Sequence, residues 1–336
     1  MIIGGGLQGV EAFYLAHKAG WQATLVDKNA DCPASGMCDL FIHTDVTQGE
    51  GVPLSSRDID LMIPTLEDDT ALAAVEYWAR DHSVPFAFDA GAYAISSSKA
   101  RSGKLFSRLG IPSPAPWPRA MYPLIAKPSR GSGSKGVRLF ASPGDMDDTI
   151  LSSVAVEMLV MEEYVQGPQY SLEIVGHLGH YRPLQVTELV MDEAFDCKCV
   201  VAPAGLSRIF VDQFSEIAKR IATSLPLKGI MDVEVILSEG IMKVIEIDAR
   251  LPSQTPTAVY WSSGRNMLCL LRDIFLSDTL PDNDTLPDTR GAVYQHIHVR
   301  QGVLEVAGEH LMSHVGPLHI RRDFFGADEA ITNYRK

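Results

Sequence analysis

The sequence predicts an α/β protein with more than one domain, and three observations support this fold class. The first 90 residues alternate short apolar segments with amphipathic ones, as in a parallel sheet covered by helices. Two apolar segments near residues 230–250 carry regularly spaced carboxylates, which indicates a pair of antiparallel strands. The chain has 336 residues, 46% of them apolar, and so exceeds the usual size of a single hydrophobic core.

The N-terminal region begins with a strand at residues 2–3 and a glycine-rich turn. The elements predicted after this turn are strands at 23–26, 61–63 and 85–88 and helices at 8–19 and 70–81. A lysine-bearing helix or helix pair at 93–110 ends at Gly110, and the proline-rich connector 111–118 can be neither helix nor central strand.

The remaining elements follow the connector. Strands are predicted at 124–127, 136–140 and 156–165, a short helix at 145–152, a strand-rich stretch at 170–199 and an amphipathic helix at 207–225. The carboxylate-bearing strands come next, before a helix at 266–275 and a strand at 292–299. We therefore expect three domains, at residues 1–90, 91–168 and 169–336.

Charged side chains share one face of the predicted hairpin. Because side chains alternate along a strand, Asp232 and Glu234 point the same way, as do Glu246, Asp248 and Arg250. Several carboxylates on one surface are costly unless cations neutralise them. Mg²⁺ prefers oxygen ligands, and an arginine suits a phosphate group. The hairpin therefore predicts metal–nucleotide chemistry.

A second pattern points to phosphate binding. Lys127 ends a predicted strand and is followed by a Gly/Ser-rich loop at 129–136. Small residues let backbone N–H groups approach phosphate oxygens, while the lysine supplies a charge. A disordered hairpin tip is the alternative. Further on, Glu162 ends an apolar strand before a turn at Gly167, where exposed backbone groups could bind an adenine edge.

The first glycines fit the pattern G-x-G-x-x-G between a strand and a helix, and Asp27 ends the next strand. This is the pattern of a dinucleotide-binding turn, and it makes an NAD-dependent oxidoreductase the alternative from another functional class. A tight turn that needs glycine for close packing is the structural alternative. The rest of the chain supplies no hydride-transfer residues, which weakens the NAD hypothesis.

Composition argues against several classes of protein. No apolar segment reaches membrane-spanning length, and no basic region precedes the first strand, which argues against membrane insertion and secretion. The net charge is −13 without a Lys/Arg cluster, so we expect no nucleic-acid partner. An odd number of cysteines, five, is typical of a reducing compartment, and we expect a cytoplasmic protein.

Taken in chain order, the lysines, the Gly/Ser loop and the carboxylate strands resemble the ATP-grasp superfamily. Within it the chain resembles the ligases of pyrrolysine biosynthesis, through the segments Gly-Gly-Leu-Gln-Gly at 5–9, Leu-Val-Asp-Lys-Asn at 25–29, Leu-Pro-Leu-Lys-Gly-Ile-Met-Asp-Val-Glu at 225–234, Val-Ile-Glu-Ile-Asp-Ala-Arg at 244–250 and Pro-Ser-Gln-Thr-Pro-Thr at 252–257. The resemblance implies an ATP-grasp fold with an N-terminal Rossmann-like domain. It also implies an ATP-dependent ligase that activates a carboxylate as an acyl phosphate.

The resemblance further implies ATP and two Mg²⁺ ions as cofactors, with Lys127 and Arg250 as catalytic residues. The metal ligands would be Glu234, Glu246 and Asp248. The ATP-binding residues would be Lys99, Lys127, Ser132, Ser134, Glu162, Val165 and Gln169, with Gly6, Asp27 and Asp45 as further nucleotide candidates. Many superfamily members have asparagine where Asp248 stands and a ribose-binding glutamate near Gln169. Lys104, one turn beyond Lys99, is a rival for its role.

The substrates implied are small molecules, 3-methyl-D-ornithine and the ε-amine of L-lysine, with another amino-acid pair as the alternative. Substrate-binding residues would be Ser171, Glu173, Asp232, Ser253 and Thr255 for the ornithine, and Leu7, Gln8 and Glu67 for lysine. Two of these have structural alternatives. Glu173 could form an ion pair, and Glu67 could cap the helix that begins near residue 68.

Overall fold

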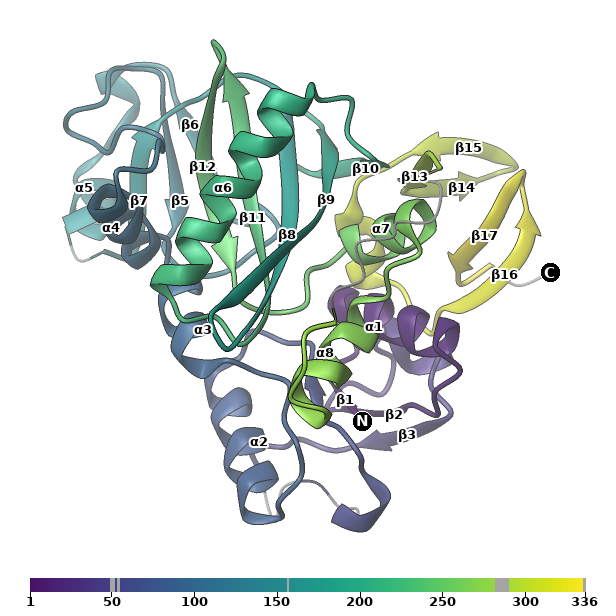
Figure 1. The fold of residues 1–336 in the computed structure, drawn as a ribbon. Helices are drawn as coiled ribbons and strands as arrows, with labels where there is room; N and C mark the ends of the chain where they lie inside the picture. The colour runs from purple at the N-terminus through teal and green to yellow at the C-terminus, as the bar shows by residue number, and fades with distance from the viewer. Residues whose placement is uncertain (49–51, 53–54, 156, 282–289, 335–336) are drawn as a thin grey trace. The chain divides into compact units, whose positions relative to one another are not determined.

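The computed structural model describes residues 1–48, 52, 55–155, 157–281 and 290–334 (Figure 1). The chain divides into two compact units. Unit 1 comprises Met1–Phe88, Lys198–Val200 and Arg250–Lys336, and unit 2 comprises Asp89–Cys197 and Val201–Ala249. Unit 1 is therefore assembled from segments far apart in the sequence, whereas unit 2 is interrupted only at residues 198–200. The mixed α/β class is confirmed, whereas the division into three domains stays a prediction.

Unit 1 begins with a four-stranded parallel sheet in the order β3-β2-β1-β4, which agrees with the alternation of segments in the sequence. Its elements are β1 (Ile2–Ile3), α1 (Leu7–Lys18), β2 (Thr24–Asp27), η1 (Pro33–Gly36), β3 (Leu40–His43), η2 (Ser56–Asp58), β4 (Ile63–Pro64) and α2 (Asp69–Asp81). Ile3, Met62 and Trp78 belong to its apolar core. The prediction of a strand at 85–88 is wrong, because Phe86 forms only an isolated bridge with Met62. The sequence analysis also did not predict β3.

The C-terminal part of unit 1 contains α7 (Thr255–Ser263), α8 (Met267–Leu276), β13 (Ala292–Gln295), β14 (Ile297–Arg300), β15 (Val303–Val306), η4 (Glu309–His314), β16 (His319–Phe324) and β17 (Ala327–Thr332). The single strand expected at 292–299 is therefore two strands separated by His296. The carboxylates of Glu11, which is buried, and Glu329, which is half-buried, connect these elements to α1. Glu11 accepts hydrogen bonds from the backbone N–H and Oγ1 of Thr257, at 2.7 and 2.6 Å. Glu329 of β17 accepts from Lys18 Nζ at 2.6 Å.

Unit 2 contains α3 (Ala90–Ser96), α4 (Lys99–Leu109), β5 (Leu124–Pro128), β6 (Arg138–Phe140), η3 (Pro143–Asp145), α5 (Asp148–Ala155), β7 (Leu159–Glu163), β8 (Gln169–His177), β9 (His180–Met191), α6 (Arg208–Ser224), β11 (Gly229–Ser238) and β12 (Ile241–Asp248). The strand β10 (Cys197–Ala202) is divided, with its residues 198–200 assigned to unit 1. A small sheet has the order β6-β5-β7, and the strands of the large sheet that lie wholly in unit 2 have the order β12-β11-β8-β9. The predicted helix region at 93–110 is the pair α3 and α4. Gly110, at φ 61°, ends α4 as the left-handed C-cap.

The large sheet buries one face and leaves the other polar. Phe214 and Ile221 of α6 belong to the same apolar core as Val233 and Val235 of β11, and Figure 1 shows α6 running along this sheet. Because side chains alternate along β11, the residues between and beside these valines point to the opposite face. That opposite face carries the carboxylates predicted from the sequence.

Candidate active site

A first row of polar side chains, the outer row, crosses β8, β11 and β12. Glu234 pairs in register with Ser171 on one side and with Glu246 on the other. Residues opposite one another in antiparallel strands have Cβ atoms about 4.5–5.5 Å apart. Glu234 and Glu246 are half-buried, so two carboxylates share a partly solvated surface. The predicted antiparallel hairpin and its carboxylate face are therefore confirmed.

A second row, the inner row, lies two residues further along the same strands. Asp232 pairs in register with Glu173 of β8 and with Asp248 of β12. Glu173 is 0% exposed and Asp232 is 5% exposed, whereas Asp248 is half-buried. The register of β8 against β9 shifts between Leu172 and Ile174, so Glu173 lies at an irregularity of the kind that redirects side chains near functional sites.

The carboxylates of the two rows are more stable in their ionised form when cations bind near them. Neighbouring carboxylates repel each other, and burial raises the cost of keeping each one ionised. Asp248 is opposite Asp232 and therefore diagonal to Glu234, which is itself opposite Glu246. The three predicted metal ligands, Glu234, Glu246 and Asp248, thus lie on one patch. Carboxylate oxygens are the ligands that Mg²⁺ prefers. The half-buried end of the face therefore suits a divalent cation, and the buried end suits an ammonium group.

A cavity of about 470 Å³ in unit 2 opens beside the outer row. This volume is within the range of small-molecule and cofactor sites. All seven ATP-binding residues predicted in this unit line it, namely Lys99, Lys127, Ser132, Ser134, Glu162, Val165 and Gln169, together with the metal candidates Glu234 and Glu246. The cavity thus combines lysines that can bind phosphate groups with carboxylates that can bind a metal ion.

The two predicted phosphate lysines contact carboxylates in this cavity. Lys99 Nζ lies 2.6 Å from Glu246 Oε1 and donates to the carbonyl of Gly131 at 2.7 Å. Lys127 Nζ lies 2.8 Å from Glu162 Oε1. The rival Lys104 is instead exposed and paired with Glu157, and it is absent from the described residues that line the cavity. The structure therefore favours Lys99.

Two contacts fix the segment that leads from the end of β7 to the turn at Gly167. Glu163 accepts from Lys243 Nζ at 2.5 Å and from the backbone N–H of Ala115 at 3.1 Å. Burial acts to raise the pKa of Glu163, but these hydrogen bonds outweigh it and lower the pKa. Gly167 has φ 155°, and a Cβ there would lie 2.1 Å from the carbonyl oxygen of Leu237. This close approach is available only to glycine.

Apolar residues that the sequence did not single out complete the cavity. They are Ile125, Tyr164, Leu189, Met191, Phe195, Ile236 and Ile245. Tyr164 and Phe195 meet edge to face with ring centroids 6.2 Å apart. Such residues suit the flat faces of a purine. The apolar end of β9 could have been noticed in the sequence, but nothing there connects it with β7.

Gln169 lines the cavity and also touches a metal candidate. Its Nε2 donates to Glu234 Oε2 at 2.7 Å. An amide can still reach a ribose hydroxyl from this place, so the ribose role stays a prediction. The contact adds a second role, because Gln169 helps to orient one carboxylate of the outer row.

The Gly/Ser loop at 129–136 is expected to close over bound nucleotide. Arg130 and Lys135 are exposed, and Gly131, Gly133 and Gly136 have positive φ. Because ordering this loop removes protease-accessible conformations, tryptic cleavage after Arg130 and Lys135 should slow several-fold with Mg²⁺–ATP. Cleavage after Arg208, exposed on α6, serves as the reference. Equal cleavage of the loop with and without nucleotide would contradict a closing cover.

The remaining nucleotide candidates belong to unit 1, and they do not line the unit 2 cavity. Asp27 Oδ2 accepts from the Gly5 N–H at 2.6 Å, and Asp45 Oδ1 accepts from Thr47 Oγ1 at 2.7 Å. A Cβ on Gly5 would lie 2.3 Å from Cys32 Sγ, whereas Gly6 has open space. The glycine turn is therefore closely packed against its neighbours, which favours the structural alternative over a dinucleotide site.

The predicted lysine-site residues of unit 1 lie together. Leu7 begins α1, and the Nε2 of the next residue, Gln8, donates to Glu67 Oε1 at 3.0 Å. Glu67 does not cap α2, because Asp68 is the N-cap residue and accepts from the N–H groups of Thr70 and Ala71. The capping alternative for Glu67 is thus wrong.

Arg250 follows the metal strand and pairs within unit 1. Its Nη2 lies 2.5 Å from Glu67 Oε1, and its side chain is 7% exposed. Ser253 and Thr255 lie at the start of α7, and the Ser253 carbonyl accepts from the Thr255 N–H at 3.1 Å. The structure therefore joins the predicted catalytic arginine to the predicted lysine site.

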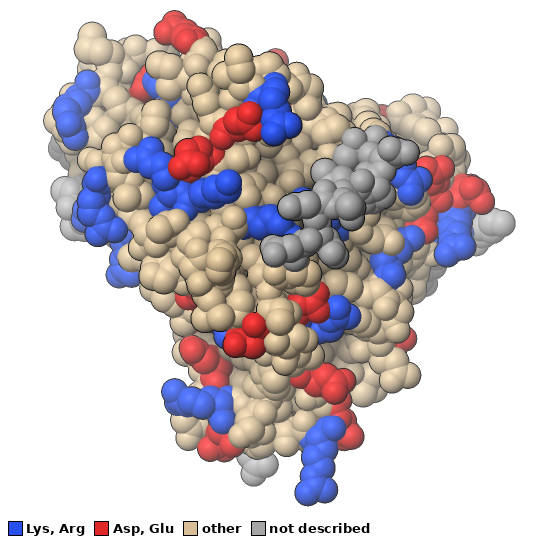
Figure 2. Space-filling model, in the orientation of Figure 1, with Lys and Arg blue, Asp and Glu red and all other residues tan. Residues whose placement is uncertain are grey.

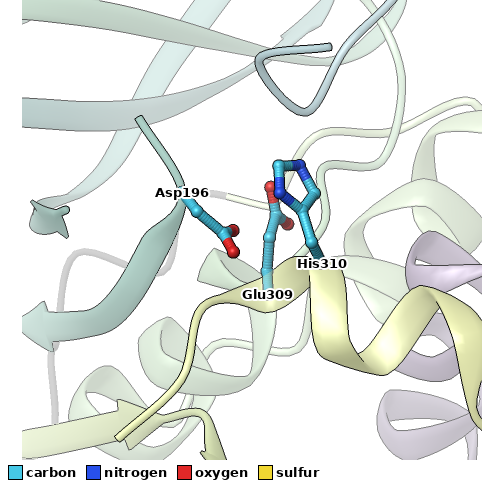
Figure 3. A group of neighbouring side chains, drawn as sticks. All are labelled: Asp196, Glu309 and His310. Atoms are coloured by element: carbon cyan, nitrogen blue, oxygen red, sulfur yellow. The ribbon is translucent and has the colours of Figure 1, made fainter. Parts of the chain in front are cut away.

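Two polar side chains at the start of η4, Glu309 and His310, are drawn in Figure 3. Glu309 accepts a hydrogen bond from Gln254, the N-cap residue of α7, so it helps to fix that helix within unit 1. Figure 3 also labels Asp196, which belongs to unit 2.

Comparison with known families identifies the central segment. Residues 96–254 match the ATP-grasp domain family. The chain is 37% identical over 314 residues to the 3-methyl-D-ornithine–L-lysine ligase of Methanosarcina barkeri, an alignment that covers 93% of this chain and 83% of that protein.

Solved structures share the fold. Biotin carboxylase of Campylobacter jejuni aligns with a TM-score of 0.73 at 17% identity, covering 89% of this chain and 75% of that one. The L-amino acid ligase of Bacillus licheniformis aligns with a TM-score of 0.70 at 17% identity, covering 89% and 79%. These likenesses confirm the ATP-grasp fold.

Proposed function

The chain belongs to the 3-methyl-D-ornithine–L-lysine ligase family of ATP-grasp enzymes, and on that premise we propose that it makes an amide between these two amino acids. The carboxylate of 3-methyl-D-ornithine and the ε-amine of L-lysine would be joined at the expense of ATP. The products would be 3-methyl-D-ornithyl-N6-L-lysine, ADP and phosphate, in the biosynthesis of pyrrolysine.

The observation that carries this proposal is the two-row carboxylate face beside the cavity. ATP-grasp ligases use ATP and Mg²⁺, and the half-buried carboxylates Glu234, Glu246 and Asp248 fit a hard cation. We propose that these three residues would hold two Mg²⁺ ions. When bound, Mg²⁺ screens the phosphate charges and orients the γ-phosphate.

The chain's own residues then hold the reactants. We propose that Lys99 and Lys127 bind phosphate oxygens, that the loop carrying Ser132 and Ser134 excludes water, and that Glu162 and Val165 contact the adenine. A carboxylate oxygen of the ornithine attacks the γ-phosphorus, and the bond to ADP breaks. The lysine ε-nitrogen then attacks the acyl carbon, phosphate leaves, and the nitrogen loses a proton. Most of the rate enhancement would come from positioning and charge.

The inner row supplies the proposed site for the activated amino acid. Ornithine-type substrates carry two ammonium groups, and Glu173 and Asp232 are buried carboxylates on neighbouring strands. A charge-assisted hydrogen bond to such a carboxylate is worth about 1.5–3 kcal/mol. Ser171 would complete this site within unit 2, and Ser253 and Thr255 of unit 1 stay predicted ornithine-binding residues. Leu7, Gln8 and Glu67 would hold lysine in unit 1.

The surface and the thiols are consistent with small-molecule substrates and a reducing compartment. On the face drawn in Figure 2, the described Lys and Arg side chains are interspersed with Asp and Glu, and the net charge is −13. We therefore propose no nucleic-acid partner. The cysteines are free thiols, which agrees with our proposal of a cytoplasmic enzyme. Among the helices that the structure describes, none has the length and apolar character that a membrane crossing needs.

The test is a product assay with ATP, Mg²⁺, 3-methyl-D-ornithine and L-lysine. We expect a new amide by mass spectrometry, with ADP and phosphate formed in equal amounts. Lysine labelled with ¹⁵N at the ε-position should place the label in the amide, and Nε-acetyl-lysine should give no product. If an amide forms only from a different pair of amino acids, the proposed substrates are wrong and that pair takes their place. In a parallel assay with NAD⁺ or NADH added, a change in nicotinamide absorbance without formation of ADP would overturn the ligase proposal.

A further inference from the structure

Arg250 is held by a carboxylate that comes from a distant part of the sequence. Two nitrogens of its guanidinium have defined partners: Nη2 lies 2.5 Å from Glu67 Oε1, and Nη1 donates to the Leu251 carbonyl at 3.3 Å. The Arg250 side chain is 7% exposed and that of Glu67 is 27% exposed. Two contacts to different nitrogens fix both the position and the plane of the guanidinium.

Glu67 is itself fixed by a neighbour. The same oxygen, Oε1, accepts from Gln8 Nε2 at 3.0 Å, and Gln8 is 8% exposed. Asp68 takes the capping role at α2, so Glu67 is not required to begin that helix. The side chains therefore form a relay from the turn after β1, through the loop after β4, to the residue that follows the metal strand.

We propose that Glu67 is the positioning residue for Arg250 and that Gln8 supports it in this role. The inference rests on the proposed function and on the catalytic role that the family resemblance implies for Arg250, which we take to be a contact with the transferred phosphate. Arginine has a long side chain with about 2 kcal/mol of rotamer entropy, and a displacement of about 1 Å in an active site can cost about 100-fold in rate. A nearly buried ion pair is suited to prevent such a displacement, because breaking it leaves an uncompensated charge.

This role differs from lysine binding in the step that it affects. A residue that only binds lysine affects the second half-reaction, in which the amine attacks the acyl phosphate. A residue that positions Arg250 already affects the first half-reaction, which needs no lysine. The rate of acyl-phosphate formation without lysine, measured by trapping with hydroxylamine, therefore separates the two roles.

The experiment compares Glu67→Gln with Asp68→Asn and Arg250→Lys. Asp68→Asn is the matched control, because it removes the same charge one residue away and asparagine remains a good N-cap. We expect Glu67→Gln to lower the lysine-free trapping rate roughly 10- to 100-fold, with little change in the KM for ATP. Glu67→Asp, which keeps the charge on a shorter side chain, should recover part of the rate.

The relay also predicts non-additivity. Once Arg250→Lys has removed the guanidinium, adding Glu67→Gln should lower the trapping rate by less than it does in the unmodified enzyme. A normal lysine-free rate in Glu67→Gln, with only the KM for lysine raised, would overturn the positioning role and leave Glu67 as a lysine ligand. A normal rate in Arg250→Lys would instead contradict the role of Arg250 in the proposed function. If Glu67→Gln does not fold, Glu67→Asp and a Gln8→Met variant test the same relay.

Discussion

Glu246→Gln and Asp248→Asn should each lower ATP turnover about 100-fold or more. Both substitutions keep the shape of the side chain and remove a charge from the patch that we assign to Mg²⁺. A bound metal contributes several kcal/mol of charge stabilisation in phosphoryl transfer, and each 1.36 kcal/mol is a factor of ten in rate. The loss should appear in steady-state assays of ADP release over a range of Mg²⁺ concentrations.

The matched control for this prediction is Glu239→Gln. Glu239 is an exposed carboxylate in the turn of the same β11–β12 hairpin, at the end away from the outer row. Its substitution should leave turnover unchanged. Circular dichroism should be intact in all three variants, because removing one of several neighbouring like charges does not disrupt packing. Near-normal turnover in both Glu246→Gln and Asp248→Asn would contradict the assignment of these two residues as metal ligands.

The carboxylate face was predictable because it depends on local rules. A strand of alternating apolar and acidic residues, a short turn and a second such strand define both the pairing and the face. Only the exact register required the structure, because it shifts between Glu234 and Val235 and so moves Ile245 out of the regular pairing. The sequence also placed Lys127 next to the Gly/Ser loop, whereas only the resemblance to the ATP-grasp superfamily grouped Lys99 with them.

Features made by distant segments were not predictable in the same way. Unit 1 is assembled from residues 1–88 and 250–336, and nothing in either segment alone indicates the other. The contact of Glu67 with Arg250 spans this separation. α7 was missed because its apolar residues have no single face, since it is buried almost all around. β3 was missed because it is short and half-exposed.

The last prediction concerns the inner row. Asp232→Asn should raise the KM for 3-methyl-D-ornithine, and for D-ornithine as its analogue without the methyl group, about 10- to 100-fold and leave the KM for ATP nearly unchanged. The estimate follows from losing a charge-assisted hydrogen bond worth about 1.5–3 kcal/mol. Asparagine keeps the size of the side chain, and Asp232 is 5% exposed, so the packing around it should survive. Asp212→Asn, an exposed change on α6 at the helix-covered face of the sheet, is the control.

Truncated substrates show which ammonium group Asp232 binds. D-norvaline lacks the side-chain amine of D-ornithine, and 5-aminopentanoate lacks the α-amine. If Asp232 binds the side-chain ammonium, the substitution should weaken use of D-ornithine and 5-aminopentanoate but not of D-norvaline. The opposite pattern would assign Asp232 to the α-ammonium and leave the side-chain ammonium to Glu173, its partner in register. Equal increases in the KM for ATP and for every amino acid would place Asp232 with the metal ligands. If no KM changes, the inner row has only a structural role. Removing the charge of a buried carboxylate that holds an ammonium group must weaken the binding of that group.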